Sequence, residues 1–286
     1  MSFFIAEVSS NHSKNIERSI EFIDKASEID CDAVKFQLFK IDKLFAPEIL
    51  EKSEIHRKRK EWELPIEFLP ILSERCKRNK IQFSCSPFYL DAVDELEPYV
   101  DFYKIASYEL LWDDLLIRCA LTKKPVIIST GMANIDEIKH AVKILRDNNC
   151  EPKVLHCTSA YPTPYGEANL SAIETIRKEM SCDVGWSDHT VNPGVIYRAI
   201  NKWNAKVIEF HLDLDAKGEE YHTGHCWLPN EIECVIKNVR DGEKSDGNGV
   251  KEPVQSEISD RMWRTDKSDG LRPFKSIRKS FNSEAN

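Results

Sequence analysis

The chain has 286 residues and a formal net charge of −8, with a pI near 5.6. This length can bury a full core as one domain, and it only slightly exceeds the roughly 250 residues typical of an eight-stranded α/β barrel. The acidic balance argues against nucleic-acid partners and polybasic membrane contacts, because both need clustered Lys and Arg.

The sequence shows no membrane or export signal. No apolar run approaches the roughly 20 residues of a transmembrane helix, and the chain begins directly with a predicted strand. The nine cysteines include no Cys-x-x-Cys pair, which favours reduced, structural thiols. We therefore expect a cytoplasmic protein.

Short apolar runs alternate with amphipathic stretches, which is typical of a parallel sheet with helices outside. In chain order, the predicted strands lie near 3–9, 33–39, 81–86, 102–107, 125–130, 153–159, 182–187 and 205–213. The predicted helices lie near 14–29, 65–79, 89–97, 112–122, 134–148, 169–180, 193–203 and 229–241. Asn134 and Asn192 are predicted N-caps, and Pro193 suits a first helical position. Eight such pairs predict an α/β fold, an eight-stranded parallel (β/α)8 TIM barrel.

Two segments fall outside this alternation. The insertion 40–64 is too long for a simple connection, and it lies on the side where such barrels have their active sites. It could be either a lid over the site or a surface excursion. After residue 241 the pattern fails and Gly- and Pro-containing stretches follow. We therefore predict a barrel catalytic domain over 1–243 and an irregular C-terminal tail over 244–286.

Polar side chains stand at the ends of the predicted strands. Lys35 and Lys104 lie in apolar runs, and a buried ammonium needs a counter-charge, either a neighbouring carboxylate or a bound anion. Hydroxyls cluster at the same strand ends, and lysines among hydroxyl donors make a phosphate or carboxylate cradle. Each serine alone could equally cap the next helix. The serines are Ser86, Ser107, Ser129, Ser159 and Ser187.

Histidines end two neighbouring predicted strands. His189 and His211 can meet at the same barrel mouth, where two imidazoles near carboxylates suit Mn²⁺, Zn²⁺ or another divalent ion. A hydrogen-bonded core role is the commoner explanation for a single strand-end histidine, and it is our interpretation of His156. Glu7, Glu109 and Tyr161 add two carboxylates and a phenol for proton transfer or polyol recognition.

The motifs in this order resemble the sialic acid (N-acetylneuraminate) synthase family over about residues 3–260. The most specific are Tyr161-Pro-Thr-Pro-Tyr165 and Ser187-Asp-His-Thr190. Further matches are Glu7-Val-Ser-Ser-Asn-His12, Val34-Lys-Phe-Gln37, Phe83-Ser-Cys-Ser-Pro-Phe88, Tyr103-Lys-Ile-Ala-Ser-Tyr-Glu109, Ile128-Ser-Thr-Gly-Met132 and His156-Cys-Thr-Ser-Ala160. The resemblance implies a barrel that condenses phosphoenolpyruvate with the aldehyde form of an N-acylated amino sugar, giving a nonulosonic acid and phosphate.

The resemblance also implies roles for individual residues. His189 and His211 resemble the protein ligands of a divalent ion, with Mn²⁺ or Mg²⁺ expected. Glu109 and Tyr161 resemble contacts to the acceptor sugar, and Glu7 resembles a carboxylate that positions a water or sugar oxygen. The residues that resemble phosphoenolpyruvate contacts are Lys35, Ser86, Lys104, Ser107, Ser129 and Ser187, with Ser159 standing where the family usually has Asn.

The chain departs from the family in two further places. The family has a Gly-Pro-Asp-His loop after the second metal histidine, whereas this chain has 217–229, whose Glu219, Glu220, His222 and His225 could replace the lost acid. The family's C-terminal antifreeze-like domain, which contributes an arginine to the sugar, is not recognisable here. We expect Glu220 and His222 to act in catalysis, and either a homodimer or a separately encoded antifreeze-like partner.

Three functions remain open from the sequence. The first is metal-dependent condensation of phosphoenolpyruvate with an aldose or N-acyl amino sugar to give a sialic-acid-like or related ulosonic acid. The second is a synthase that accepts a phosphorylated sugar, which the acidic loop 217–229 disfavours. The third is a non-catalytic barrel subunit of a two-chain synthase.

Overall fold

The computed structural model describes residues 1–283. The chain divides into two compact units, Met1–Glu243 and a second that begins at Lys244. The first unit contains every strand, and the second contains the short elements η5 (Gln255–Glu257), α13 (Ile258–Arg261) and α14 (Lys275–Ser283). The sequence predicts little helix after residue 241, so these helices, and the extension of α12 to Ser245, are additions from the structure.

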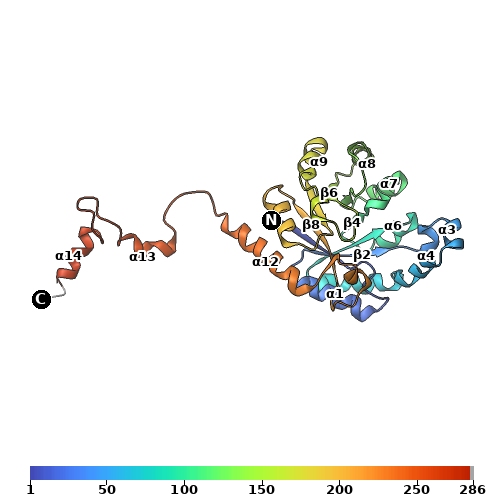
Figure 1. The fold of residues 1–286 in the computed structure, drawn as a ribbon, viewed down its shortest axis with the longest axis horizontal. Helices are drawn as coiled ribbons and strands as arrows, with labels where there is room; N and C mark the ends of the chain where they lie inside the picture. Colours follow the sequence, from blue (N-terminus) through green and yellow to red (C-terminus); the bar gives the residue numbers. More distant parts are fainter. Residues whose placement is uncertain (284–286) are drawn as a thin grey trace. The chain divides into compact units, whose positions relative to one another are not determined.

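The first unit is a closed barrel of eight parallel strands, as predicted (Figure 1). Each strand pairs with the next along the chain, and β1 pairs with β8 to close the barrel. A short ninth strand continues the sheet by pairing with β8 in parallel. The strands are β1 (Phe3–Glu7), β2 (Ala33–Leu38), β3 (Gln82–Pro87), β4 (Phe102–Ile105), β5 (Val126–Ser129), β6 (Lys153–Cys157), β7 (Val184–Asp188), β8 (Val207–Leu212) and β9 (Cys226–Trp227).

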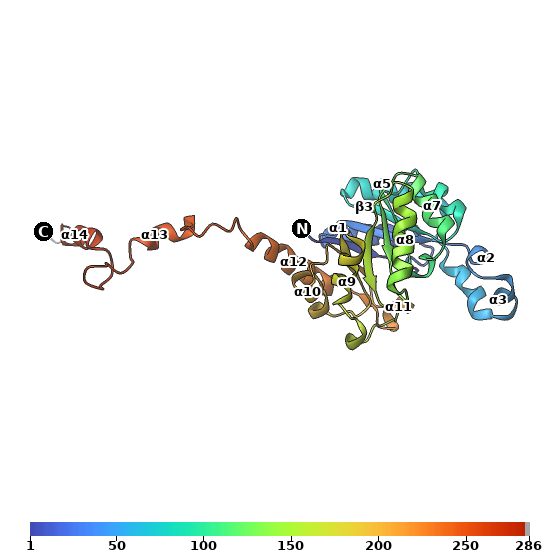
Figure 2. The same ribbon diagram turned by 90° about the horizontal axis from the view of Figure 1, so that it is seen from above.

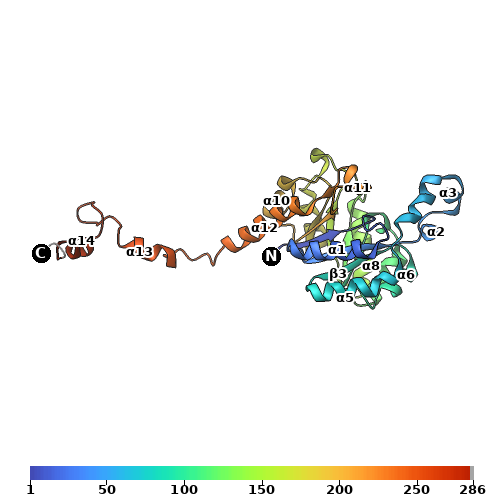
Figure 3. The ribbon, with the colours of Figure 1, turned by 90° about the horizontal axis from the view of Figure 1, so that it is seen from below.

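Helices connect the strands and surround the barrel (Figure 1). Helices α1 and α5 lie side by side on one flank (Figure 3). The main ones are α1 (Ile16–Glu28), α5 (Leu69–Asn79), α6 (Leu90–Leu96), α7 (Asp113–Leu121), α8 (Ile135–Asp147), α9 (Ala172–Met180), α10 (Pro193–Asn201) and α12 (Pro229–Ser245). The short ones are α2 (Ile41–Leu44), α3 (Pro47–Lys52), α4 (Glu54–Lys58), α11 (Glu219–His222), η1 (Arg59–Trp62), η2 (Ile66–Phe68), η3 (Ser107–Glu109) and η4 (Tyr165–Glu167).

Two predicted helix caps are confirmed. The Asn134 side chain accepts from the N–H groups of Asp136 and Glu137, and a capping box completes the start of α8. The Asn192 side chain accepts from the N–H of Gly194, and Pro193 is the first residue of α10. These caps satisfy N–H groups that have no partner within the helix.

The inward rows of the barrel change from apolar to polar along six of its strands. A small apolar cluster fills the amino-terminal part of the interior: Ile5, Ala33, Phe102, Ile127, Leu155 and Val207. Because strand side chains alternate between faces, the residue two positions further on points inward as well. Those next residues are Glu7, Lys35, Lys104, Ser129, Cys157 and Glu209. The apolar cluster is therefore the floor of a polar site at the carboxyl ends of the strands.

The insertion after β2 folds as three short helices and one turn of 3-10 helix, and it stands at one side of the barrel (Figure 2). Helices α3 and α4 contain no buried residue. Within the segment, the Arg59 guanidinium lies over the rings of Phe45 and Trp62. The backbone N–H of Ile41 donates to the Glu63 carboxylate at 2.8 Å, which ties the two ends of the segment together.

Within residues 1–283, every helix is too short or too polar to cross a membrane.

Candidate active site

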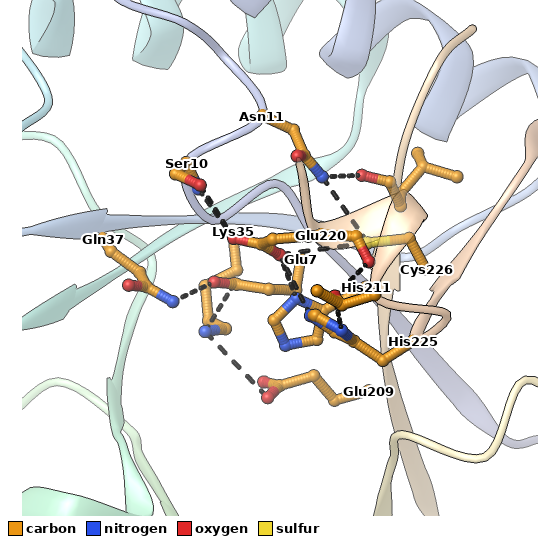
Figure 4. Close-up of polar contacts among 12 residues, drawn as sticks. Glu7, Ser10, Asn11, Lys35, Gln37, Glu209, His211, Glu220, His225 and Cys226 are labelled. Atoms are coloured by element: carbon orange, nitrogen blue, oxygen red, sulfur yellow. Dashed lines mark hydrogen bonds and ion pairs between the residues drawn. The ribbon is translucent and has the colours of Figure 1, made fainter. Parts of the chain in front are cut away.

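Four charged residues form the centre of the polar site, and Figure 4 shows three of them, Glu7, Lys35 and Glu209. The Lys35 ammonium lies 2.5 Å from a Glu7 oxygen and 3.9 Å from Glu209, and the Lys104 ammonium lies 3.6 Å from Glu209. All four residues are at most 5 % exposed. The counter-charges of the two lysines in this structure are thus carboxylates on β1 and β8, and Gln37 donates to the other oxygen of Glu7 at 2.6 Å.

Burial and pairing act differently on the two lysines. Burial opposes the charged form of Lys35, but Glu209 and Glu7 outweigh it and raise its pKa. For Lys104 burial outweighs the attraction of Glu209, and its pKa is lowered. The neighbouring carboxylate therefore does not fully offset the cost of burying the Lys104 charge. A bound phosphate or carboxylate would supply further negative charge.

The serines complete the lysine site. Lys35 donates to the Ser86 hydroxyl at 3.3 Å and Lys104 to Ser129 at 2.6 Å. The hydroxyl of Ser187 donates to Glu209 at 3.3 Å. The structure therefore brings three of the predicted serines into direct contact with the charged centre.

The other two serines lie against Gly131, after β5. The Gly131 N–H donates to the Ser107 hydroxyl at 3.0 Å, and the buried Ser159 hydroxyl has no hydrogen-bond partner among the described residues. A Cβ on Gly131 would lie 2.1 Å from the Ser159 oxygen and 2.9 Å from the Ser107 oxygen. Only glycine lets the backbone approach both hydroxyls, so this part of the site is a small cradle with one free hydroxyl.

Glu109 is a buried carboxyl on η3, with one oxygen lacking a partner among the described residues. Burial raises its pKa to about 7, against a smaller opposing effect of Lys104. A carboxyl that keeps its proton near neutral pH can donate a hydrogen bond to a substrate oxygen.

His189 and His211 come together as predicted. Strands β7 and β8 pair up to Asp188 opposite Phe210, and the two imidazole centres lie 5.3 Å apart just beyond. His189 Nδ1 donates to the Thr158 carbonyl at 2.9 Å, so in the neutral ring Nε2 carries the lone pair. The Tyr161 ring packs beside these histidines, 4.3 Å from the His189 centre and 6.1 Å from that of His211.

The loop between β8 and β9 adds a second set of potential metal ligands beside these histidines, with the ring centre of His225 5.0 Å from that of His211 and 6.5 Å from that of His189. Among the residues that the structure describes, His211, Glu220, His225 and Cys226 have ligand-type atoms within 4.8 Å of one another. Burial opposes ionisation of Glu220, but hydrogen bonds from His211 and His225 hold its pKa well below the usual range. His189 is not part of this set.

The structure does not bring His222 to the site. Its side chain is exposed on α11, beside Tyr221, whereas His225 is 6 % exposed and faces Glu220. Glu219 is exposed as well. His156 has the hydrogen-bonded position expected of it, with Nε2 3.0 Å from the Ala168 carbonyl and its ring next to Trp186.

The sequence reasoning assigned no role to Glu209, Gln37 or Cys226. Glu209 and Gln37 were visible as inward positions from the strand alternation, two residues from His211 and Lys35. Cys226 follows an irregular loop, and no periodic pattern indicated that it would meet His211.

Known proteins are similar to this chain in both fold and sequence. The model of the NeuB family matches residues 22–251. An uncharacterised protein of Methanocaldococcus jannaschii is 38 % identical over 258 residues, which cover 89 % of this chain and 75 % of that protein. The N,N'-diacetyllegionaminic acid synthase of Legionella pneumophila is 33 % identical over 275 residues, covering 90 % and 76 %.

A solved structure agrees over the same region. The N-acetylneuraminic acid synthetase of Leptospira borgpetersenii superposes with a TM-score of 0.80 at 29 % identity, covering 91 % of this chain and 90 % of that one. Fold, charged site and relatives together define a carbon–carbon bond-forming transferase that uses phosphoenolpyruvate, of the sialic acid synthase kind. The chain belongs to the NeuB family, which confirms the resemblance found in its motifs.

Proposed function

We propose that this chain condenses phosphoenolpyruvate with the aldehyde form of an unphosphorylated N-acylated amino sugar, giving a nonulosonic acid and inorganic phosphate. The observation that carries the proposal is the pair of buried lysines with serine hydroxyls at the barrel mouth. Lys104 in particular is short of negative charge, because burial outweighs its one carboxylate partner.

The lysines and serines would hold phosphoenolpyruvate. Lys35 and Lys104 act as point charges for its phosphate and carboxylate, and hydroxyls act as neutral donors. The free Ser159 hydroxyl and the Gly131 backbone would approach the ligand without steric hindrance. The same ammonium groups would stabilise the charge that grows on phosphate as its bond to C2 breaks.

The acceptor would lie against Glu109 and Tyr161. Attack of the enol carbon C3 on the aldehyde carbon places charge on the aldehyde oxygen, and a protonated Glu109 can donate to a sugar oxygen near neutral pH. Glu7, fixed by Lys35 and Gln37, can orient the water that adds at C2. The relative from Legionella is named for a diacetylated amino-sugar acid, which supports an N-acyl acceptor.

The donor set around His211 fits a divalent ion. Imidazole nitrogens of His189 and His211 would hold it on one side, and the carboxylate of Glu220 lies 2.8 Å from His211 Nδ1 on the other. The chemistry that such an ion supplies when bound is Lewis acidity toward a carbonyl oxygen. Mn²⁺ and Mg²⁺ are the ions expected from the resemblance.

The direct test is phosphate release from phosphoenolpyruvate with a panel of acceptors: N-acyl amino sugars, plain aldoses and phosphorylated sugars, each with added divalent ions. We expect release that depends on an unphosphorylated N-acyl amino sugar, and a nine-carbon acid by mass spectrometry. Turnover only with phosphorylated sugars would instead support the ulosonate phosphate synthase alternative. Binding of phosphoenolpyruvate without turnover of any acceptor would support a non-catalytic subunit.

A further inference from the structure

Asp188, the last residue of β7, is a buried carboxylate outside the polar site. Strand side chains alternate between faces, so Asp188 points away from the interior that Ser187 faces. Its exposed fraction is 0 %. Trp186 lies on the same outer face, and its Nε1–H donates to Asp188 Oδ1 at 3.0 Å. Asp188 is therefore separated from the barrel mouth by the strand itself, and it can affect a reaction there only through other residues.

The carboxylate of Asp188 joins three segments of the chain. Oδ1 also accepts from the backbone N–H of Thr190 at 3.2 Å and from its hydroxyl at 2.7 Å. Oδ2 accepts from the Trp227 Nε1–H on β9 at 3.1 Å and from the backbone N–H of Val191 at 3.2 Å. Five neutral donors thus meet one carboxylate. Hydrogen bonds to a charged acceptor are stronger than those between neutral groups, so this contact can hold its partners firmly.

The segment 188–191, called here the β7 turn, is strained. Val191 has a φ of +49°, in the left-handed region that a β-branched side chain rarely adopts. Such conformations persist only where the surrounding contacts enforce them. The Val191 N–H is held by Asp188 Oδ2, and its side chain packs against the main hydrophobic core. His189 lies inside this turn, so the carboxylate fixes the backbone on both sides of that imidazole.

The loop after β8 (213–225) is tied to the same carboxylate at its far end. Within the loop, the Ser10 hydroxyl donates to the Glu220 carboxylate at 2.9 Å (Figure 4). Gly224 turns the chain with a φ of +89°, which an L side chain rarely adopts. Strand β9 follows directly, and the Trp227 indole then links the end of the loop to the β7 turn.

We propose that Asp188 is a positioning residue for the acceptor sugar: it keeps the β7 turn in its strained form and sets the distance between this turn and the loop after β8. His189 belongs to the turn and His225 to the loop. The Tyr161 ring centre lies 4.3 Å from that of His189 and 5.0 Å from that of His225. These three rings border the space proposed for the sugar, so its width depends on the contact of Asp188 with Trp227. The inference rests on the proposed function for the identity of the ligand.

The phosphoenolpyruvate part of the site should depend much less on Asp188. Ser187, its neighbour, is held by strand pairing with Cys157 on β6 and Glu209 on β8. The two buried lysines lie further away around the barrel, on β2 and β4. Loss of the Asp188 contacts should therefore change the use of the acceptor selectively.

The substitution Asp188→Asn breaks one part of the network and keeps the other. Its amide oxygen should take the Oδ1 position, where three donors from Trp186 and Thr190 meet. The amide nitrogen then faces the N–H groups of Val191 and Trp227 and cannot accept from them. Asp188→Asn thus releases the end of the β7 turn and β9, while the contacts nearer the strand remain.

Hydrogen–deuterium exchange, read by mass spectrometry, measures this release without any substrate. In Asp188→Asn we expect exchange at least about 10-fold faster in 189–192 and 213–227, with 128–132 unchanged, because opening is local. Trp227→Phe should speed exchange in 213–227 alone. If Asp188→Asn does not fold, as judged by circular dichroism, Trp227→Phe tests the same link.

A second substitution separates the two tasks of the carboxylate. Asn adopts the left-handed region more readily than valine does. Val191→Asn in the Asp188→Asn background should therefore return exchange in 189–192 to within about threefold of the wild type. Exchange in 213–227 should stay fast, because the Trp227 indole still lacks its acceptor.

Steady-state phosphate release, with the N-acyl amino sugar that gives the fastest turnover, measures the effect on the reaction. Asp188→Asn and Trp227→Phe should each raise the acceptor KM by ~10-fold and leave the KM for phosphoenolpyruvate within about twofold. Trp186→Phe is the matched control, since it removes an equal indole donor from Asp188 but leaves the link to β9. It should leave both KM values within about twofold of the wild type.

Three results would overturn the proposal. One is unchanged exchange in 213–227 for both Asp188→Asn and Trp227→Phe. The others are equal increases of the two KM values, or equal effects of Trp186→Phe and Trp227→Phe on the acceptor KM, since either would give Asp188 a general structural role. Absence of turnover with every acceptor in the wild type would instead contradict the proposed function, and the exchange experiment would still decide whether Asp188 holds the loop.

Discussion

The buried charges of this site differ in how completely other groups of the protein neutralise them. Lys35 is held by Glu7 at 2.5 Å, whereas Lys104 shares Glu209 with Lys35 at 3.6 Å and is 1 % exposed. A buried charge with incomplete pairing costs stability, and a ligand of opposite charge recovers that cost. Lys104 is therefore the residue whose removal best separates ligand binding from folding.

Lys104→Met should weaken phosphoenolpyruvate binding by at least about 100-fold, while the free energy of unfolding changes by no more than about 2 kcal/mol. The small change follows because relief of desolvation offsets the lost contact of Glu209, which keeps Lys35 3.9 Å away. Calorimetric titration and urea denaturation measure the two quantities. The exposed Lys143→Met is the control and should alter neither. Unfolding of Lys104→Met with normal binding in the remaining protein would make Lys104 a structural ion-pair partner.

Glu109 should make stability depend on pH. Its pKa rises from an ordinary 4.5 to about 7 in the folded protein, so between these values the folded state keeps a proton that the unfolded state has lost. Stability then falls as pH rises through this window, by about 1.4 kcal/mol per pH unit from this group, or ~3 kcal/mol in total. Glu109→Gln lacks this slope.

The check is urea denaturation of both proteins at several pH values. Relative to the wild type, Glu109→Gln should gain nothing near pH 4.5 and about 3 kcal/mol at pH 8. Parallel stability curves for the two proteins across this range would show that the Glu109 carboxyl is ionised in the folded state at neutral pH.

At the scale of elements, the alternation of strand side chains predicted much of the site. It did not predict which residues of the loop after β8 reach the site. The two-residue period placed Lys35, Lys104 and His211 on inward rows because a strand imposes that period locally. The choice of His225 over His222 depends on Gly224 and on contacts from Ser10, which is 210 residues away from Glu220 in the sequence. Such long-range contacts leave no local pattern to read.

Gly131, after β5, allows a test of whether the close approach of its backbone to Ser159 and Ser107 is required. Gly131→Ala places a Cβ 2.1 Å from the Ser159 oxygen, so Ser159 or the backbone must move into the space proposed for phosphoenolpyruvate. We expect phosphoenolpyruvate binding to weaken by ~10-fold or more and stability to fall by about 1–3 kcal/mol.

A second substitution distinguishes two effects of Gly131→Ala: steric overlap with the Ser159 side chain, and the reduced backbone freedom of residue 131. Ser159→Gly in the Gly131→Ala background removes the overlapping side chain and should restore stability to within about 1 kcal/mol of Ser159→Gly alone. A Gly131→Ala variant with unchanged binding and stability would mean that the cradle relaxes freely.

At the scale of the whole molecule, the proposed phosphoenolpyruvate site and the proposed acceptor site lie mainly on different elements of the barrel. Phosphoenolpyruvate would meet Lys35, Lys104 and serine hydroxyls, most of them on β2 to β5, whose positions are set by strand register. The acceptor would meet Tyr161 and the loop after β8, where the chain departs from the sialic acid synthases it resembles. The acceptor preferred by this chain should therefore differ from that of the sialic acid synthases more than the reaction with phosphoenolpyruvate does. The reason is that polar groups of a site reject a substrate that leaves them unpaired.

N-acetylmannosamine should accordingly be a poor acceptor, with a kcat/KM at least about 10-fold below that of a related N-acyl amino sugar. Tyr161 is 43 % exposed and its ring packs against His189 and His225, where we propose that the sugar binds. Tyr161→Phe should lower acceptor kcat/KM by ~10-fold, as the loss of one hydrogen bond implies, and leave the KM for phosphoenolpyruvate within twofold. Steady-state phosphate release with each substrate varied in turn measures both. Efficient formation of N-acetylneuraminate by the unaltered chain would refute the specificity proposed here, and it would mean that the loop after β8 serves the ordinary acceptor with a different set of ligands.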